Sequence, residues 1–205
     1  MDDFSTTGET RELLESWAVR DTRINCIFND YNRGISATTQ VGADQTAGDY
    51  LGFLDNDDEL APDCLFQIAK EINNNKVDVI YTDEDLIGDD GSRHVVFHKP
   101  AFNKALHYSH NYITHFVVVA KDLFDRSGGL YSEYDGAQDY DLMLRVTSRT
   151  GNIHHIPRIL YHWRAVATST SIDHDQNPYA HVAGRKALEK HLEEQRTGIG
   201  VVDAD

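Results

Sequence analysis

The most constraining feature of this sequence is the alternation of short apolar segments with segments of helical periodicity. Strands are predicted over 23–28 ("RINCIF"), 50–54 ("YLGFL"), 77–82 ("VDVIYT"), 115–120 ("HFVVVA") and 153–164 ("IHHIPRILYHWR"). Helices are predicted over 5–19, 36–47, 62–73, 137–151 and 178–196, where apolar residues recur at helical spacing. Strands that alternate with helices are typical of an α/β fold with a mostly parallel central sheet flanked by helices.

Composition narrows the class of protein. The 205 residues are 40% hydrophobic, which is enough for one domain with its own core. The formal net charge of −15 argues against a nucleic-acid partner, because such binding depends on Lys and Arg that neutralise phosphates. Cys26 and Cys64 form no metal or disulfide motif, and no apolar run approaches the length of a membrane span. We expect a cytoplasmic protein without a signal peptide.

An acidic loop follows the predicted strand 50–54 directly. Asp55, Asp57, Asp58 and Glu59 lie within five positions. Ligands of α/β sheets bind at the carboxyl ends of the strands, and residues two apart in an extended segment point the same way. Asp55 and Asp57 are therefore suited to a hard divalent cation, Mn²⁺ or Mg²⁺, shared with a diphosphate.

Four interpretations compete for this loop. It could be a plain acidic loop that caps the next helix, and for Asp58 and Glu59 we prefer this interpretation. A calcium loop fits poorly, because Leu60 stands where glycine is expected and Phe66 where glutamate is expected. A phosphatase of the haloacid dehalogenase type usually places Thr or Val after its aspartate pair, unlike this chain. The fourth interpretation is the DxD motif of a nucleotide-sugar glycosyltransferase.

Later polar residues offer further candidates. Asp139 falls in the first turn of a predicted helix, where the helix dipole favours an ionised carboxylate, whereas Asp141 points elsewhere and is expected to be structural. His162 and Arg164 are two apart in a strand-like segment and would form an anion clamp on one face. The carboxylates at 83–85 either flank an acceptor or belong to a solvated loop. No ligand spacing is visible among His94, His98, His107, His110 and His115.

Blocks along the whole chain carry a family resemblance. The segments "NRGISATTQVGADQTAGDYLGFLDNDDELAP", "DVIYTDEDLI", "FHKPAFNKAL", "NYITH", "GAQDYDLMLRV" and "IPRILYHWR" occur in that order. Together they resemble family 2 glycosyltransferases with the GT-A fold, and most closely the bacterial subgroup that builds surface polysaccharides. Each block alone is weakly specific, but the ordered set is strongly specific.

The resemblance implies roles for individual residues. Asp57 and Asp55 match the metal-binding DxD carboxylates, with Asp55 also near the donor ribose. His162 matches a later contact to the metal or the diphosphate, and Asp139 matches the general base. The remaining donor-binding residues implied are Asp2, Asp3, Arg33 and Arg164.

The sequence departs from the pattern of many relatives in two places. Thr39 and Gln40 stand where these relatives carry Arg and Asn, which leaves open how the diphosphate is gripped there. Gln138 precedes the expected base in place of the commoner Glu, so no second carboxylate perturbs Asp139 from that side.

The resemblance implies an inverting, metal-dependent glycosyltransferase that uses Mn²⁺ or Mg²⁺. The donor would be a UDP- or dTDP-sugar and the acceptor a saccharide or lipid-linked saccharide at the inner membrane face. Residues 1–120 would bind the nucleotide sugar, 121–178 would form the acceptor and catalytic part, and 179–205 a C-terminal helix and tail. The alternatives are the phosphatase and an inactive nucleotide-sugar-binding module.

The start of the chain raises one more expectation. In the family, a strand, a helix and a second strand precede the block that here reads "DDFS" at residues 2–5. We therefore expect an N-terminally truncated domain with weak activity or none. Its exposed sheet edge would favour self-association.

Overall fold

The computed structural model describes residues 1–88, 90–164 and 178–202. Within these residues the strands form one six-stranded sheet. The strand order is β1 (Tyr50–Gly52), β5 (Val117–Ala120), β3 (Val79–Ile87), β6 (Ile153–Arg164) and β2 (Glu59–Leu60), and β4 (Arg93–Phe97) pairs with β3 outside this path. The strands predicted over 50–54, 77–82, 115–120 and 153–164 are thus confirmed.

The strand directions correct part of the expected architecture. β3 and β6 pair in parallel, whereas β1 with β5, β3 with β5, β3 with β4 and β2 with β6 pair antiparallel. The α/β class is confirmed, but the prediction of a mostly parallel sheet is wrong. β1, β3 and β6 do run in one direction, as helical crossovers require. β5 lies between β1 and β3 and runs against both, and the sequence pattern does not report such an insertion.

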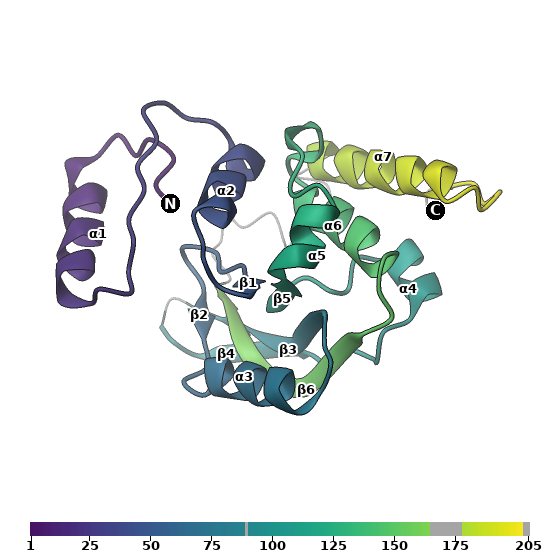
Figure 1. Ribbon diagram of the computed structural model, residues 1–205, viewed down its shortest axis with the longest axis horizontal. Coiled ribbons are helices and arrows are strands. Elements are labelled where there is room, and N and C mark those ends of the chain that lie inside the picture. The colour runs from purple at the N-terminus through teal and green to yellow at the C-terminus, as the bar shows by residue number, and fades with distance from the viewer. Residues whose placement is uncertain (89, 165–177, 203–205) are drawn as a thin grey trace.

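Helices cover both faces of the sheet, as Figure 1 shows. On one face α3 (Cys64–Asn74) packs Cys64 and Ile68 against residues such as Ile80 and Leu160. On the other, α5 (Lys121–Arg126) and α6 (Gln138–Thr147) pack against Val79, Tyr81 and Val119. Successive β3 residues face opposite sides, so this one strand supports both core clusters.

Further helices complete the arrangement. α7 (Pro178–Glu194) lies on α6 through a cluster that includes Leu144, Ala183 and Ala187. The shorter elements are α2 (Ile35–Asp44), α4 (Lys104–Ser109) and the 3₁₀ turn η1 (Ser132–Tyr134). In the described part of the chain, no helix combines the length and the apolar composition needed to cross a bilayer.

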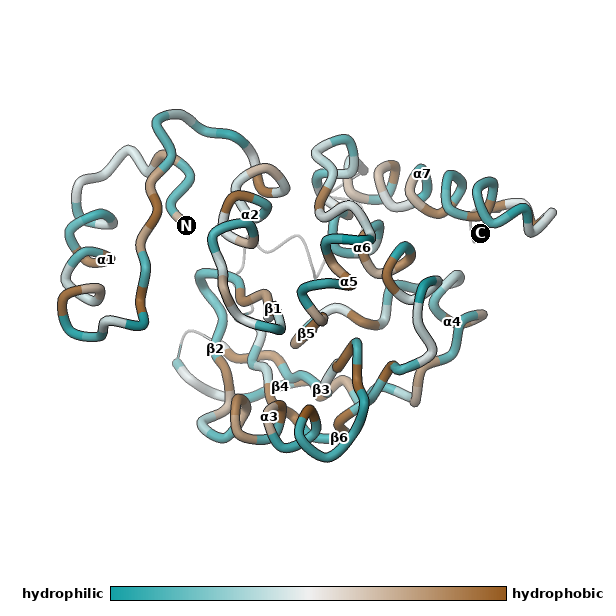
Figure 2. Tube along the Cα trace, viewed as in Figure 1, coloured by the Kyte–Doolittle hydropathy of each residue, from teal (hydrophilic) through white to brown (hydrophobic). Residues whose placement is uncertain are grey.

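The N-terminal segment is packed differently. α1 (Gly8–Arg20) buries none of its residues, and Figure 1 places it to one side of the sheet. The strand predicted over 23–28 is wrong: the segment begins in a turn and makes only a parallel bridge, between Asp2 and Phe28. Its apolar residues, brown in Figure 2, have no neighbouring strand to pair with among the residues that the structure describes. An apolar β pattern becomes a strand only where a partner edge lies beside it.

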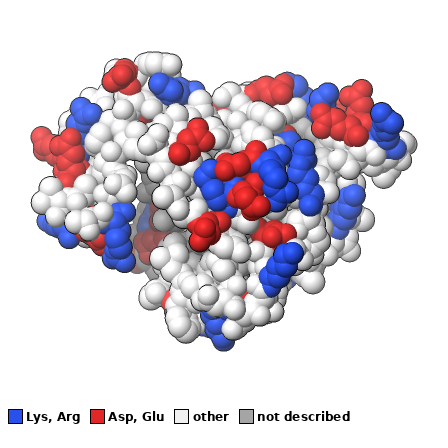
Figure 3. Space-filling model, in the orientation of Figure 1, with Lys and Arg blue, Asp and Glu red and all other residues white. Residues whose placement is uncertain are grey.

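The surface charge is mixed on the face drawn in Figure 3. The largest charged group in this view lies near α5, where acidic and basic side chains alternate. The helix α5 itself carries two i,i+4 ion pairs, of Lys121 with Asp125 and of Arg126 with Asp122. Such exposed pairs contribute little to stability. The acidic groups that are candidates for catalysis or metal binding lie elsewhere, at the strand ends.

Candidate active site

The acidic loop after β1 is anchored by the end of β6. Asp58 accepts hydrogen bonds from the Tyr161 hydroxyl and from the backbone N–H of Arg164, the latter at 2.7 Å. The N–H of Asp55 donates to the same hydroxyl at 3.4 Å. Partial burial raises the pKa of Asp58, against these hydrogen bonds. Asp58 therefore fixes the loop onto β6 and makes no helix-cap contact, contrary to the interpretation preferred from sequence.

Arg164 reinforces this attachment. Its Nε donates to the carbonyl of Asp57 at 2.6 Å and its Nη2 lies 2.6 Å from Glu59. The guanidinium thus binds the loop itself in this structure. The expected pairing of Arg164 with His162 on an open face is not formed, because His162 is 2% exposed and its Nδ1 contacts Asp85 at 2.6 Å.

Three potential metal ligands converge at this loop. Asp55, Asp58 and His115 each offer an atom within 4.8 Å of the other two, and His115 Nε2 lies 3.7 Å from Asp55 Oδ2. The expected set was Asp55, Asp57 and His162. Asp57 is exposed beside this group but does not belong to it. The sequence shows no ligand spacing for His115, because only the fold brings it to the loop.

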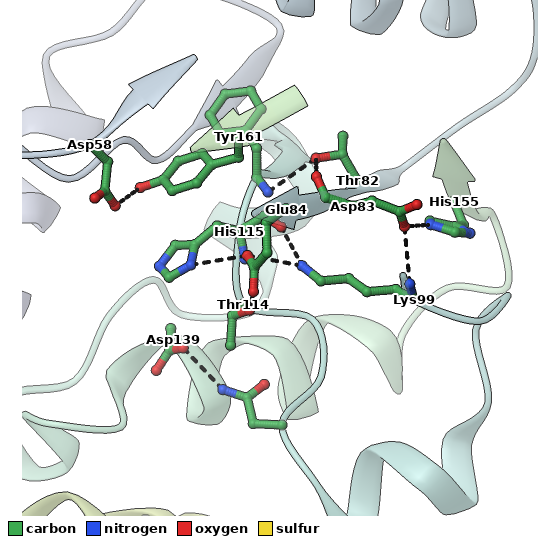
Figure 4. Close-up of polar contacts among 12 residues, drawn as sticks. Asp58, Thr82, Asp83, Glu84, Lys99, Thr114, His115, Asp139, His155 and Tyr161 are labelled. Carbon is green, nitrogen blue, oxygen red and sulfur yellow. Dashed lines mark hydrogen bonds and ion pairs between the residues drawn. The ribbon is translucent and has the colours of Figure 1, made fainter. Parts of the chain in front are cut away.

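A buried network of hydrogen bonds around Glu84 holds His115 in place. Glu84 accepts from the Thr114 hydroxyl at 2.8 Å, from the His115 N–H at 3.1 Å and from Lys99 Nζ at 3.2 Å, and it contacts His115 Nδ1 at 3.2 Å. Burial lowers the pKa of His115, but the carboxylates of Asp55 and Glu84 outweigh burial and raise it to about 9. Figure 4 shows this network, with the imidazole between Asp58 and Asp139 in that view.

The carboxylates at 83–85 are part of the central strand. Asp83, Glu84 and Asp85 are only 2–3% exposed, so a solvated loop is wrong. Each has an imidazole partner: Asp83 contacts His155 at 2.7 Å and His98 at 2.9 Å, Glu84 contacts His115, and Asp85 contacts His162. Buried carboxylates require such partners, and the sequence pattern alone did not reveal them.

Asp139 lies in the first turn of α6, as predicted. It is partly buried, and its Oδ2 accepts a hydrogen bond from Asn111 Nδ2 at 3.0 Å. Asp141 is buried and pairs with Arg145 at 2.5 Å, and Arg145 also donates to the carbonyl of Gly129. Asp141 is therefore structural, and Asp139 is the carboxylate of this turn that remains available for chemistry.

The expected donor residues near the N-terminus form their own cluster. Asp3 accepts hydrogen bonds from the N–H groups of Arg33 and Gly34 at 2.8 and 2.9 Å and from Asn29. Asp2 is 9% exposed, and its carboxylate accepts from the Ser5 N–H at 3.2 Å. Across the described ranges, neither aspartate makes a hydrogen bond or ion pair with the acidic loop.

Gln40, one of the two departures from the family pattern, has a structural task. Its carbonyl oxygen accepts from the Leu130 N–H at 2.9 Å and its amide donates to Asp44 at 2.7 Å. The side chain packs against Gly129, where an added Cβ would lie 2.1 Å from Gln40 Oε1, and the φ of +67° at Gly129 also favours glycine. Gln40 therefore holds the turn that leads toward α6.

Comparisons with known proteins identify the family of the chain. The sequence model of the family described as glycosyl transferase family 2 matches residues 1–128. An uncharacterised protein, y4gI, of Sinorhizobium fredii is 38% identical over 194 residues, which are 93% of this chain and 21% of the relative. The O-antigen biosynthesis protein RfbC of Myxococcus xanthus is 34% identical over 196 residues, 95% of this chain and 15% of the relative. The chain thus spans about a fifth or less of these two relatives.

Solved structures show the same fold. S. aureus TarS 1–349 in complex with UDP-GlcNAc aligns with a TM-score of 0.67 at 16% identity, over 96% of this chain and 64% of that one. The mannosyltransferase PcManGT from Pyrobaculum calidifontis, in complex with GDP-Man and Mn²⁺, aligns with a TM-score of 0.62 at 14% identity, over 98% and 55%. The chain has the GT-A fold and belongs to glycosyl transferase family 2.

Proposed function

We propose that this chain transfers a sugar, with inversion, from a nucleotide-sugar donor to a hydroxyl of a saccharide or lipid-linked saccharide. The observation that carries the proposal is the convergence of Asp55, Asp58 and His115 at the end of β1, with Asp139 at the start of α6. These groups come from both proposed parts of the domain, 1–120 and 121–178. The relative named for O-antigen biosynthesis supports an acceptor in polysaccharide synthesis.

A divalent cation fits the acidic loop. Two carboxylates and an imidazole within 4.8 Å of one another form a donor set suited to Mn²⁺, and the exposed Asp57 beside them can add a further oxygen. When bound, the cation supplies Lewis-acid stabilisation of the diphosphate as the glycosidic bond breaks. His162 stays a predicted ligand that competes with His115, because its Nε2 is buried without a partner in the described residues.

Asp139 acts as the general base. The N-terminus of α6 favours its ionised form, and Asn111 holds one carboxylate oxygen so that the other can accept the proton of the acceptor hydroxyl. A base on the face opposite the leaving diphosphate gives a single displacement, and hence inversion. No covalent intermediate on the chain is needed.

The donor is proposed to be a UDP- or dTDP-sugar whose nucleoside contacts Asp2, Asp3 and Arg33. The exposed Arg33 side chain lies 5.0 Å from the Tyr31 ring and is free to meet a phosphate or base. Arg164 would reach the diphosphate after releasing Glu59. A cytoplasmic location fits the two free cysteines, because reducing compartments keep thiols unpaired.

The test is donor turnover by the wild type and by Asp139→Asn. The amide keeps the size of the carboxylate but cannot take the proton, so we expect turnover to fall by about 10²–10⁴-fold with donor affinity little changed. Asp122→Asn is the matched control, since Asp122 lies in the first turn of α5 and pairs with the exposed Arg126. Near-normal turnover by Asp139→Asn would remove this residue from the mechanism. Nucleotide binding without turnover by the wild type would favour an inactive binding module.

A further inference from the structure

Two neighbouring residues of β3 each hold an imidazole, and the two arrangements differ in what they leave open. Glu84 holds His115 through Nδ1, and Asp85 holds His162 through Nδ1. Residues 84 and 85 face opposite sides of the sheet. In each pair the Nε2 atom remains for another partner, so the surroundings of Nε2 decide which histidine can bind a ligand.

His115 is fixed on three sides. Glu84 contacts its backbone N–H and its ring, and Lys99 donates to its carbonyl as well as to Glu84. Its ring stacks on Tyr161 with centroids 4.7 Å apart and an angle of 11°. Tyr161 in turn donates to Asp58, so one buried side chain positions both the imidazole and the acidic loop.

The nitrogen left open points at the acidic loop. His115 Nε2 lies 3.7 Å from Asp55 Oδ2, within the group that also includes Asp58. Histidines that bind metals almost always use one ring nitrogen for the metal and the other for a carboxylate or carbonyl, which fixes the ring. His115 has this arrangement, because its Nδ1 contacts the Glu84 carboxylate while its Nε2 faces the acidic loop.

We propose that His115 Nε2 is a cation ligand beside Asp55 and Asp58, that Glu84 is its positioning carboxylate, and that the site consequently selects Mn²⁺ over Mg²⁺. This inference rests on the proposed function, which includes a cation at the loop. Mg²⁺ prefers oxygen ligands and water, whereas an imidazole favours transition metals. The cation takes the place of the proton on Nε2.

His162 lacks the same opening. It is 2% exposed, its Nε2 has no partner among the described residues, and it is not among the three groups that converge at the loop. Its carboxylate Asp85 is also approached by Arg93 at 3.8 Å. Substitution of His115 should therefore weaken cation binding, whereas substitution of His162 should not.

The experiment measures Mn²⁺ binding by the electron paramagnetic resonance of free Mn²⁺, without nucleotide and with UDP, and Mg²⁺ by competition. We expect His115→Gln to weaken Mn²⁺ binding at least tenfold while Mg²⁺ changes less, so that the preference for Mn²⁺ shrinks. Glu84→Gln should weaken Mn²⁺ binding by about 10–100-fold. Should Glu84→Gln fail to fold, Thr114→Val removes a single hydrogen bond to Glu84 and should shift the same ratio in the same direction.

Asp83→Asn is the control, because Asp83 is buried on the same strand and pairs with His98 and His155, and the amide oxygen of Asn can still accept the Lys99 N–H. Its Mn²⁺ affinity should equal that of the wild type. A loss with His162→Gln and none with His115→Gln would overturn the proposal in favour of His162. Equal binding by all variants would overturn the proposal alone. A wild type that binds no cation, even with UDP, would overturn the metal dependence of the proposed function and this inference with it.

Discussion

The N-terminal arm, residues 1–34, and the sheet body, residues 50–164, use apolar residues in opposite ways. In the arm, α1 buries nothing, and Trp17 and Val19 are 48% and 86% exposed. In the body, Val79, Ile80 and Tyr81 of β3 are 0% exposed. Few buried contacts mean low local stability, so the arm should open in events that leave the body folded.

This difference divides the candidate site. The groups proposed for the cation and for proton transfer rest on strands and helices of the body. Asp2, Asp3 and Arg33, proposed for the nucleotide, rest on the arm and are held by hydrogen bonds within 1–38. The chemical groups would then rest on the more stable part of the molecule, whereas donor binding would depend on the less stable arm.

The largest expected effect is on the body. Phe124 is 0% exposed and packs near Phe53 in the core cluster on the α5 and α6 face. Phe124→Ala should lower the free energy of unfolding by about 3–5 kcal/mol, measured by urea denaturation, because it leaves a cavity in a packed core. A loss below about 1 kcal/mol would mean that the body is as loosely packed as the arm.

The next effect depends on pH and tests whether the site is held by the body. The pKa of His115 is about 9 when folded against an ordinary value of 6.5. Its contribution to stability is therefore fully present below pH 6.5 and is lost as the pH rises through 9. Relative to His115→Gln, the wild type should lose up to about 3 kcal/mol between pH 6 and 10, measured by denaturant titration at each pH. Parallel curves for both proteins would contradict the network.

A smaller effect is expected within the arm. Asp3→Ala removes the acceptor of the Arg33 and Gly34 N–H groups. Hydrogen exchange at these two amides should accelerate by about fivefold to tenfold, in keeping with roughly 1 kcal/mol per hydrogen bond. Amides of β3 should keep their protection. Faster exchange in β3 would show that the arm and the body unfold together as one cooperative unit.

The smallest effect is expected for Trp17→Ala. Trp17 is 48% exposed on a helix without buried residues, and its ring is contacted by Arg20 at 5.1 Å. The free energy of global unfolding should change by less than about 0.5 kcal/mol, as for other surface substitutions. A loss comparable with that of Phe124→Ala would reveal that the α1 surface is covered in solution.

Local patterns predicted most helices and strands, because periodicity depends on neighbours along the chain. The start of α6, with Asp139 in its first turn, and the acidic loop after β1 both followed from such patterns. The insertion of β5 between β1 and β3 did not follow, because strand adjacency depends on tertiary packing. The prediction of a strand over 23–28 was wrong for the same reason. The apolar pattern is that of a strand, but among the described residues no partner strand lies beside it.

The candidate site was predicted where one segment supplies it and missed where several do. Asp55 and Asp57 belong to one short sequence motif, residues 55–59. His115 acquires its position only through β5, Glu84 through β3 and Tyr161 through β6. No spacing along the chain encodes three segments that meet at one point. The sequence pattern therefore gives His115 no role and places Glu84 beside an acceptor or in a solvated loop.

The pairing of β3 with β6 has a consequence for synthesis on the ribosome. It joins Val79 to Ile153 and Ile87 to Arg164, residues separated by more than seventy positions. While the intervening chain is being made, β3 presents an edge without its long partner, and the carboxylates of Asp83 and Asp85 have yet to meet His155 and His162. Closing so long a loop is slow, and unpaired edges favour aggregation. The nascent chain therefore exposes an edge that favours aggregation until Arg164 has left the exit tunnel.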